Sequence, residues 1–232
     1  MSNSRNFSLI IPAAADSGAN PDEMPVIFTL DNTGAMLCVK SILGLNLDVF
    51  DKICFTVLRK HVDRFNVDVM LELQFRRYGL DKADIVILEE KTSSQAETIV
   101  KTVEKENISG PIFIKDADCC FKADVIAENG VAVYPLENLE LVDPRNKSYV
   151  AVDDMRHITN IIEKRIISHL FNAGGYCFED ASKFVEEYHK HKDLGDIYLS
   201  HLIYSMLLER EVFRPIEVSD YSDWNLKKQT LQ

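Results

Sequence analysis

Three common motifs of phosphate binding and nucleophilic catalysis are missing from this chain. Its 232 residues contain no Gly-x-x-x-x-Gly-Lys-Ser/Thr, no Gly-x-Gly-x-x-Gly and no Gly-x-Ser-x-Gly. The first two motifs place backbone amides around phosphates, and the third presents a serine nucleophile on a sharp turn. Their absence argues against a P-loop nucleoside triphosphatase, a dinucleotide-dependent enzyme of the usual kind and an α/β-hydrolase.

Positive charge and long apolar runs are also scarce. Lys and Arg number 26 against 37 Asp and Glu, which gives a formal net charge of -11. A protein that follows the phosphates of a nucleic acid needs an excess of positive charge on at least one face. The apolar run at residues 7–15 reaches only about half of the roughly 20 residues that span a bilayer. We therefore expect neither a nucleic acid nor a membrane as partner.

The five cysteines form no metal-binding or disulfide pattern. Their number is odd, and the one close pair, Cys119 and Cys120, is adjacent, which suits neither a zinc knuckle nor a disulfide framework. The apolar run near the N-terminus ends at Asp16 instead of at a small-residue cleavage site, so we interpret it as a strand. Reduced thiols in a cytoplasmic protein are the expectation.

Apolar periodicity in the first half alternates between strand-like and helical segments. The expected strands are 7–15, 52–58, 85–88 and 111–116, and the expected helices are 34–45, 61–78 and 93–107, with a loop over 16–24. Ser93 and Ser94 are candidate caps of the third helix. This rhythm predicts an α/β fold with a mostly parallel, doubly wound sheet.

After Asp118 the alternation of strands and helices gives way to a series of short strands. Short strands are expected at 130–134, 148–152, 157–163 and 175–178, followed by helices at 180–189 and 196–209 and by a strand and coil from 213 onward. No long linker divides the chain. We expect one domain over residues 1–232 in two lobes, 1–120 and 121–232, with a ligand at the carboxyl ends of the parallel strands.

The most informative local pattern is a buried strand that runs directly into Asp116 and Asp118. Two residues apart in extended backbone, both carboxylates emerge on the same face. Like charges held this close are costly unless a cation lies beside them, and Mg²⁺ prefers such oxygen ligands together with phosphates and water. A solvated turn after the strand explains the two aspartates equally well.

This segment resembles the strand-Asp-x-Asp-x-x-Phe element of sugar-nucleotide pyrophosphorylases, which are nucleotidyltransferases of the GT-A-like fold. Other elements resemble that family in the same order: IIPAA at 10–14, SQAET at 94–98, IEK at 162–164, NAGGYCF at 172–178, DIYLS at 196–200 and SDW at 222–224. The resemblance spans nearly the whole chain. It implies a Rossmann-like, three-layer α/β/α fold, a nucleotide-binding lobe at 1–120 and a sugar-phosphate-binding lobe at 121–232.

The resemblance also implies the reaction. A nucleoside triphosphate and a sugar phosphate, or a similar phosphorylated alcohol, would be joined with Mg²⁺ and with release of pyrophosphate. The implied metal ligands are Asp118 as the principal one, Asp223 as the second and Asp116 as an outer partner. The implied catalytic residues are Asp118 and Lys164, the latter at the sugar phosphate. The implied substrate-binding residues are Ala13, Ala14, Gln95 and Ala96 for the nucleotide, and Glu163 and Gly175 for the sugar.

The first loop departs from the family pattern. Members of the family carry an Arg and a Pro-Lys-Pro there, whereas residues 15–30 contain no Arg or Lys, and Val26 follows Pro25 where the Lys would stand. Loss of a cationic clamp slows phosphoryl transfer by orders of magnitude. An active enzyme would need another cation, and Lys115, Arg59, Lys60 and Lys91 are the candidates near strand ends.

Two other functions remain open at this point. A catalytically weak domain of the same fold that binds a nucleotide or a sugar phosphate would tolerate the altered loop. A GT-A glycosyltransferase would use Asp116 and Asp118 on a nucleotide sugar, although Glu163, Lys164 and the Gly-Gly-Tyr element match the pyrophosphorylases better. Without the order of the motifs, Lys164 would be a surface lysine and the glycine pair a tight bend. The base, the sugar and the formation of a homo-oligomer are not determined.

Overall fold

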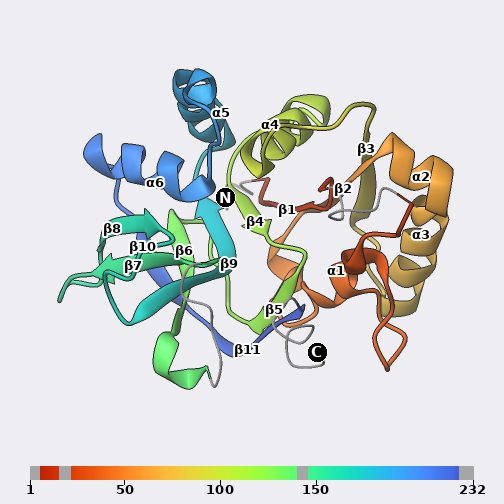
Figure 1. Ribbon diagram of the computed structural model, residues 1–232, viewed down its shortest axis with the longest axis horizontal. Helices are drawn as coiled ribbons and strands as arrows, with labels where there is room; N and C mark the ends of the chain where they lie inside the picture. The colour runs from red at the N-terminus through yellow and green to blue at the C-terminus, as the bar shows by residue number, and fades with distance from the viewer. Residues whose placement is uncertain (1–5, 16–21, 140–145, 225–232) are drawn as a thin grey trace, which may run out of the picture.

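Strands and helices alternate along the first half of the chain, and strands dominate the second half (Figure 1). The computed structural model describes residues 6–15, 22–139 and 146–224. The strands are β1 (Ser8–Pro12), β2 (Lys52–Leu58), β3 (Ala83–Leu88), β4 (Ile112–Lys115), β5 (Cys119–Lys122), β6 (Gly130–Pro135), β7 (Ser148–Val152), β8 (Ile158–Glu163), β9 (Leu170–Phe178), β10 (Arg214–Glu217) and β11 (Ser219–Asp223). The α-helices are α1 (Leu37–Lys40), α2 (Arg59–Phe65), α3 (Val67–Tyr78), α4 (Gln95–Lys105), α5 (Ala181–His191) and α6 (Leu199–Leu208). Short 3-10 turns are η1 (Val26–Phe28), η2 (Leu47–Val49), η3 (Leu136–Asn138) and η5 (Lys192–Leu194).

A nine-stranded mixed sheet forms the centre of the molecule. Its main path is β10-β6-β9-β4-β1-β2-β3, and β7 and β8 join it beside β9. Neighbouring strands from β3 to β4 are parallel, β9 runs antiparallel to both β4 and β6, and β10 is parallel to β6. The expectation of a mostly parallel α/β sheet is confirmed.

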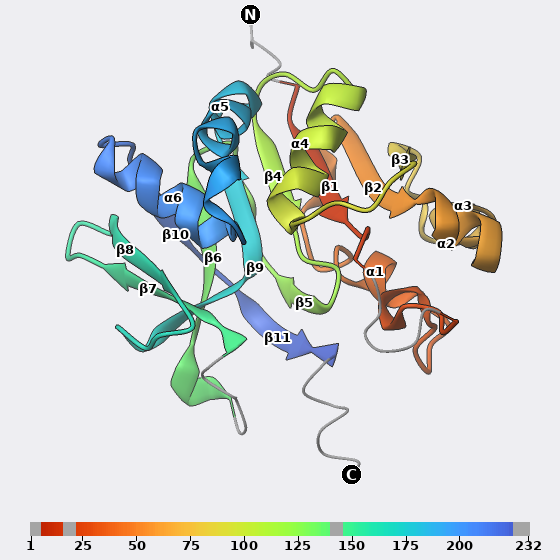
Figure 2. The same ribbon diagram turned by 45° about the horizontal axis from the view of Figure 1, so that its top comes forward.

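Helices cover both faces of this sheet (Figure 2). Ile10, Ile112 and Ile114 pack in one apolar cluster with residues of α4, α5 and α6. Leu9 and Phe113 belong to a second cluster with residues of α1 and α3. Successive side chains of β1 and β4 therefore enter opposite layers, as strands buried on both faces require. Within the described residues, no helix has the length and apolar character of a bilayer span.

Several elements differ from the sequence-based expectation. The helix expected over 61–78 is two helices, because Asn66 adopts a left-handed conformation with φ of 52° and interrupts the helical path. The helix expected over 34–45 reduces to the single turn α1. The coil expected after 213 contains a further strand, β11, which pairs antiparallel with β5. Part of the expected loop over 16–24 lies outside the described residues.

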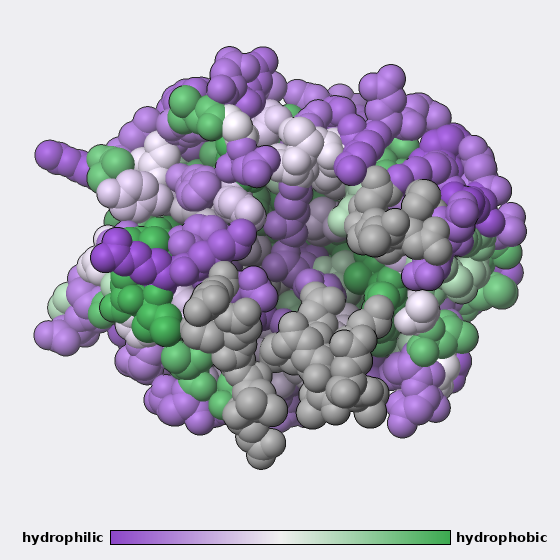
Figure 3. Space-filling model, in the orientation of Figure 1, coloured by the Kyte–Doolittle hydropathy of each residue, from purple (hydrophilic) through white to green (hydrophobic). Residues whose placement is uncertain are grey.

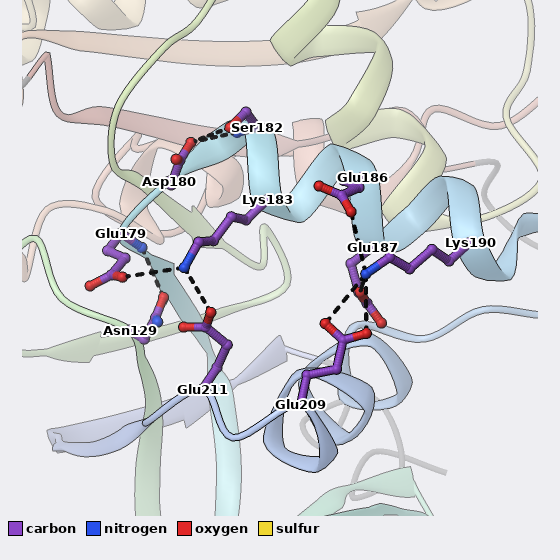
Figure 4. A network of polar contacts seen from close by, with 10 residues as sticks. All are labelled: Asn129, Glu179, Asp180, Ser182, Lys183, Glu186, Glu187, Lys190, Glu209 and Glu211. Atoms are coloured by element: carbon purple, nitrogen blue, oxygen red, sulfur yellow. Dashed lines mark hydrogen bonds and ion pairs between the residues drawn. The ribbon is translucent and has the colours of Figure 1, made fainter.

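Ion pairs fix α5 against the segment that follows α6 (Figure 4). Lys183 contacts Glu211 at 2.7 Å, and Lys190 contacts Glu209 at 3.1 Å. Lys190 also lies 3.0 Å from Glu187, whose side chain is only 2% exposed. Exposed pairs add little to stability, so the buried Glu187 is the member of this network that matters for the packing of α5.

A buried lysine supports the turn between β4 and β5. Nζ of Lys115 donates to the backbone oxygens of Asp116 at 2.7 Å and Cys119 at 2.9 Å, and to Sγ of Cys119 at 3.2 Å. The ammonium also lies 4.6 Å from the centre of the Phe121 ring. Lys115 is 0% exposed. Its three N–H donors are thus all engaged, and the path of residues 116–119 depends on them.

We predict that Lys115→Met lowers the free energy of unfolding by about 2 to 4 kcal/mol, because two buried carbonyls lose a charged donor. Urea denaturation measures this loss. The matched control is Lys122→Met at the exposed end of β5, whose Nζ pairs with Asp220 at 2.8 Å and which should change stability by no more than about 0.5 kcal/mol. A loss below about 1 kcal/mol for Lys115→Met would contradict the proposed support of the turn.

A buried histidine packs beneath η1, close to the first loop. His61 on α2 is 2% exposed, and its ring lies edge-on to Phe28 with 5.3 Å between the ring centres. Among residues 6–15, 22–139 and 146–224, neither ring nitrogen has a hydrogen-bond partner. Burial, reinforced by the positive charge of Lys60, lowers the pKa of His61 from 6.5 to about 4. The folded chain therefore holds this imidazole in its neutral form.

We predict that acid destabilises the protein through His61. The unfolded chain takes up the proton more readily, so stability present above pH 6.5 is lost as the pH falls towards 4, by about 3 kcal/mol in total. His61→Leu should remove this part of the slope in urea denaturation between pH 7 and pH 4. An unchanged slope in His61→Leu would refute the assignment.

Candidate functional site

Two cavities meet at the carboxyl ends of β1 and β4. The first, the β1 cavity, has a volume of about 450 Å³ and is lined by Pro12, Ala14, Ala15, Ile27, Lys91, Thr92, Ser93, Ser94, Gln95, Thr98, Asp116, Ala117 and Asp118. The second, the β9 cavity, has a volume of about 190 Å³ and is lined by Gln95, Asp116, Asp118, Cys119, Asn146, Lys147, Ser148, Glu163, Asn172, Ala173, Gly174, Tyr176, Tyr198, Leu199, Ser200 and Tyr221. Gln95, Asp116 and Asp118 border both cavities. Figure 3 shows hydrophilic residues gathered along the hollow near the centre of this face.

The N-terminus of α4 forms one wall of the β1 cavity. Ser94 caps the helix by accepting a hydrogen bond from the Glu97 amide at 3.1 Å, and Glu97 accepts in return from the Ser93 amide at 2.6 Å. These two hydrogen bonds fix the first turn. Gln95, the first helical residue, donates from Nε2 to Oδ1 of Asp116 at 2.6 Å. The positive end of the helix dipole thus borders the cavity. The Gln95 side chain orients the Asp116 carboxylate.

A bulge in β9 shapes the junction from the other side. Tyr176 pairs with Val131 and Asn172 with Val133, so two extra residues lie on β9 between these pairs. Gly174 within the bulge has φ of 83°, and a Cβ there would lie 2.8 Å from Oδ2 of Asp116. The Gly174 oxygen accepts from the Asp116 amide at 2.9 Å. Glycine is required because the backbone must pass this close to the carboxylate in a left-handed conformation.

Asp116 and Asp118 form the acidic floor shared by the cavities. Burial, and secondarily the charge of Asp118, raises the pKa of Asp116 above its usual range. The positive charges of Lys115 and Lys147 and the hydrogen bond from Gln95 oppose this rise. The charge of Asp118 therefore destabilises the ionised form of Asp116, and an added cation would relieve this repulsion.

The oxygen donors at this floor suit a hard divalent cation. Asp116 and Asp118 supply carboxylates, whereas Oδ2 of Asp223 is engaged by Lys147 at 2.6 Å and by the Tyr221 hydroxyl at 3.2 Å. Within residues 6–15, 22–139 and 146–224, no three His, Cys, Asp or Glu side chains are grouped as a metal site. Mg²⁺ would thus take its remaining ligands from water and phosphate, as it commonly does.

Glu163 is held at the wall of the β9 cavity by two serines. Its Oε2 accepts hydrogen bonds from the hydroxyl of Ser148 and, at 2.8 Å, from that of Ser200 at the start of α6. Lys164 follows Glu163 with φ of 57° and is exposed. Its Nζ donates to the Tyr198 hydroxyl at 2.9 Å. Lys164 therefore reaches the rim of the cavity through Tyr198 and does not line its interior.

The ten metal-binding, catalytic and substrate-binding residues that the family resemblance implies divide into two groups. Five of them line the cavities: Ala14, Gln95, Asp116, Asp118 and Glu163. The others, Ala13, Ala96, Gly175, Lys164 and Asp223, are outside both linings. Ala13 and Ala96 are 0% exposed in the core. A Cβ on Gly175 would meet Ala132 at 2.8 Å and Phe113 at 2.9 Å, so this glycine serves packing, and its neighbour Gly174 faces the cavity.

Lys147 and Tyr221 line the β9 cavity and were not predicted. Lys147 lies in a turn-rich stretch with no periodicity, so no sequence signal marks it. Tyr221 stands two residues before Asp223, a spacing that places both side chains on one face of a strand and that could have identified it.

Cations are few around the β1 cavity. Lys91 is the one Lys or Arg among its described lining residues. The guanidinium of Arg59 is bound to Glu89 at 3.1 and 3.2 Å, and Lys115 is buried beneath the β4–β5 turn. Lys60 is exposed and outside the lining. Of the four candidate replacements for the first-loop cations, Lys91 has the suitable position.

Known structures share this architecture. A scan against protein-family models and a search of curated protein sequences found no match. A nucleoside-diphosphate-sugar pyrophosphorylase from Vibrio cholerae superimposes with a TM-score of 0.74 and 18% identity, covering 91% of this chain and 92% of that chain. An inositol-1-phosphate CTP transferase from T. maritima gives a TM-score of 0.70 and 15% identity, covering 96% and 89%. A UDP-glucose pyrophosphorylase in complex with UDP-glucose gives 0.68 and 11%, covering 95% and 93%.

These similarities extend over nearly the full length of the chains compared, at identities between 11% and 18%. They confirm the resemblance that the ordered motifs indicate and the three-layer α/β/α architecture. The chain has the fold of the sugar-nucleotide pyrophosphorylases and related nucleotidyltransferases.

Proposed function

We propose that this protein transfers a nucleotidyl group from a nucleoside triphosphate to a sugar phosphate or a similar phosphorylated alcohol and releases pyrophosphate. The observation that carries the proposal is the pair of cavities that share Gln95, Asp116 and Asp118. One cavity accommodates the nucleotide and the other the acceptor, and their junction is where the two phosphates would meet. Holding two reactants in line supplies a large part of the rate enhancement in such reactions.

The nucleotide belongs on the β1 side. The small side chain of Ala14 leaves room for the nucleotide at the end of β1. The N-terminus of α4 offers Ser93, Ser94 and the positive end of its dipole to the phosphates. Ala13 and Ala96 would act from the core, by allowing the backbone to approach the base closely. Lys91 would supply the positive charge that the first loop lacks.

The acceptor belongs on the β9 side. Glu163, oriented by Ser148 and Ser200, offers a carboxylate that accepts hydrogen bonds from sugar hydroxyls. Asn172 also lines this cavity, and its Oδ1 accepts a hydrogen bond from the Gly174 amide at 2.9 Å, which fixes the bulge. Lys164 would meet the acceptor phosphate at the rim, after leaving the Tyr198 hydroxyl.

The reaction needs no protein nucleophile. A phosphate oxygen of the acceptor would attack the α-phosphorus, forming a new P–O bond, while the bond from the α-phosphorus to the bridging oxygen breaks and pyrophosphate leaves with the electron pair. Asp118 and Asp116 would hold Mg²⁺, which neutralises phosphate charge when bound. The chain's own task is to orient both substrates and to exclude water from the junction.

The altered first loop supports a second candidate function. Residues 15–30 contain no Lys or Arg, and a domain of this fold without that clamp could bind a nucleotide or sugar phosphate with little catalysis. Pyrophosphate release, assayed over a panel of nucleoside triphosphates and sugar phosphates, separates the candidates. Release with at least one pair supports the transferase. No release, together with equally tight binding of mono- and triphosphates, supports the binding domain.

We predict that Asp118→Asn removes the Mg²⁺ dependence of nucleotide binding. In the wild type, saturating triphosphate at 100 times its dissociation constant should add about 2.7 kcal/mol of stability with Mg²⁺, and affinity should fall at least about tenfold in EDTA. In Asp118→Asn, affinities with and without Mg²⁺ should be equal. Asp124→Asn, at an exposed position six residues further along, is the control. A retained Mg²⁺ effect in Asp118→Asn would exclude this residue as a ligand.

We also predict that two lysines act on different substrates. Lys91→Ala should weaken triphosphate binding roughly tenfold or more, because a charge-assisted hydrogen bond is lost, and should leave sugar-phosphate binding unchanged. Lys164→Ala should do the reverse. Calorimetric titration of each variant with each ligand tests this separation. If either lysine affects both ligands equally, its assignment to one cavity is wrong.

A further inference from the structure

A lysine and an aspartate form a nearly buried ion pair at the β9 cavity. Nζ of Lys147 lies 2.6 Å from Oδ2 of Asp223 and 2.7 Å from the Tyr221 hydroxyl oxygen. The side chains of Lys147 and Asp223 are 15% and 7% exposed. Lys147 and Tyr221 line the cavity, whereas Asp223 is outside its lining. The pair therefore places the positive charge of Lys147 at the cavity wall, while the negative charge of Asp223 lies behind it, outside the lining.

Contacts from two strands, β11 and β9, fix the position of this ammonium. β11 carries Tyr221 and Asp223 on one face, and the Tyr221 hydroxyl also donates to Asp223 at 3.2 Å. Nζ lies 5.7 Å from the centre of the Phe171 ring and 5.3 Å from that of Tyr221. The Lys147 backbone oxygen accepts from the Lys164 amide at 2.9 Å. A surface lysine has no such framework, so the site is built around this side chain.

Asp223 already has a cation in this arrangement. The family resemblance assigns this carboxylate to a divalent metal ion. A metal ion bound to Oδ2 would lie within a few ångströms of the ammonium, and two like charges at that distance in a poorly hydrated site repel strongly. Lys147 and the metal ion are therefore alternative partners of Asp223.

The ammonium retains capacity for a ligand. A lysine side chain has three N–H donors, and among the described residues Tyr221 and Asp223 accept two of them. The third is available to an acceptor in the cavity that Lys147 lines. A phosphate oxygen is the acceptor that a fixed point charge of this kind binds most readily.

We propose that Lys147 is a resident cation of the β9 cavity: Asp223 holds its ammonium and does not ligate the divalent ion, and the ammonium binds a phosphate group of the ligand. That this phosphate belongs to a sugar phosphate rests on the proposed function, but phosphate binding itself does not. The ammonium of Lys147 then neutralises phosphate charge on the β9 side of the cleft. At the floor that both cavities share, Mg²⁺ would neutralise it.

The first experiment titrates the full-length protein with Mn²⁺ alone and follows water-proton relaxation. Asp118→Asn should weaken binding at least tenfold. The double variant Lys147→Met with Asp223→Asn removes the pair without a change in net charge and should bind Mn²⁺ within twofold of the wild type. Lys147→Met alone should bind Mn²⁺ more tightly, since it frees Asp223. A double variant as defective as Asp118→Asn would overturn the proposal, because Asp223 would then be a metal ligand.

The second experiment titrates inorganic phosphate in EDTA by calorimetry. Lys147→Met should weaken binding at least tenfold, Lys147→Arg should retain most of it, and Lys122→Met at the exposed end of β5 should equal the wild type. If Lys147→Met does not fold, Lys147→Gln removes the charge and keeps a hydrogen-bond donor. No phosphate binding by the wild type, or equal binding by the uncharged variants, would overturn the assignment.

These outcomes are separable from those of the proposed function. If the protein binds phosphate through Lys147 but releases no pyrophosphate with any substrate pair, the resident-cation proposal stands and the proposed transferase function is wrong. If the protein releases pyrophosphate and Lys147→Met leaves the KM for the sugar phosphate unchanged, the transferase function stands and the resident-cation proposal is wrong.

Discussion

The buried ammonium of Lys115 holds the turn on which both cavities depend. It binds the backbone oxygens at the two ends of this turn, Asp116 and Cys119, and so fixes where the two aspartates lie. Lysine is rarely buried because its charge must leave water. Here the carbonyl dipoles, the Phe121 ring and the nearby carboxylates compensate for that cost. The same charge also opposes the rise in the pKa of Asp116, so one side chain supports both the shape and the electrostatics of the floor.

The bulge in β9 completes the junction because it brings backbone to the carboxylates from the opposite side. Gly174 passes close to Asp116, and its oxygen binds the Asp116 amide. A regular strand would place a side chain at this position and close the passage between the cavities. Irregular geometry at Asn172–Gly174 therefore links the two halves of the cleft. The neighbouring Gly175 is needed for a different reason, the tight packing against Ala132 and Phe113.

Much of the fold could be predicted because buried parallel strands produce continuous apolar runs. The strand at 52–58 was predicted with its observed bounds, and the Ser94 cap of α4 was found from its residue type. β5 and β11 could not be found in this way, since both are short and partly polar and each forms only by pairing with a partner about 100 residues away. The break at Asn66 was missed because apolar spacing continues across it. Local patterns do not report non-local pairing or a single left-handed residue.

The site was predictable where the chemistry lies within one segment and not where it depends on contacts between segments. Asp116 and Asp118 follow one strand, so their common position at the cavities could be predicted, and Gln95 could be placed by its helix start. Lys147 gains its importance from Asp223, 76 residues away in the chain, and no spacing rule connects them. The family pattern has cations in the first loop, whereas this chain places Lys91, Lys115 and Lys147 on other elements. In a chain with a net charge of -11, each buried carboxylate needs a local positive partner. The distribution of these three lysines therefore determines where positive charge lies in the cleft.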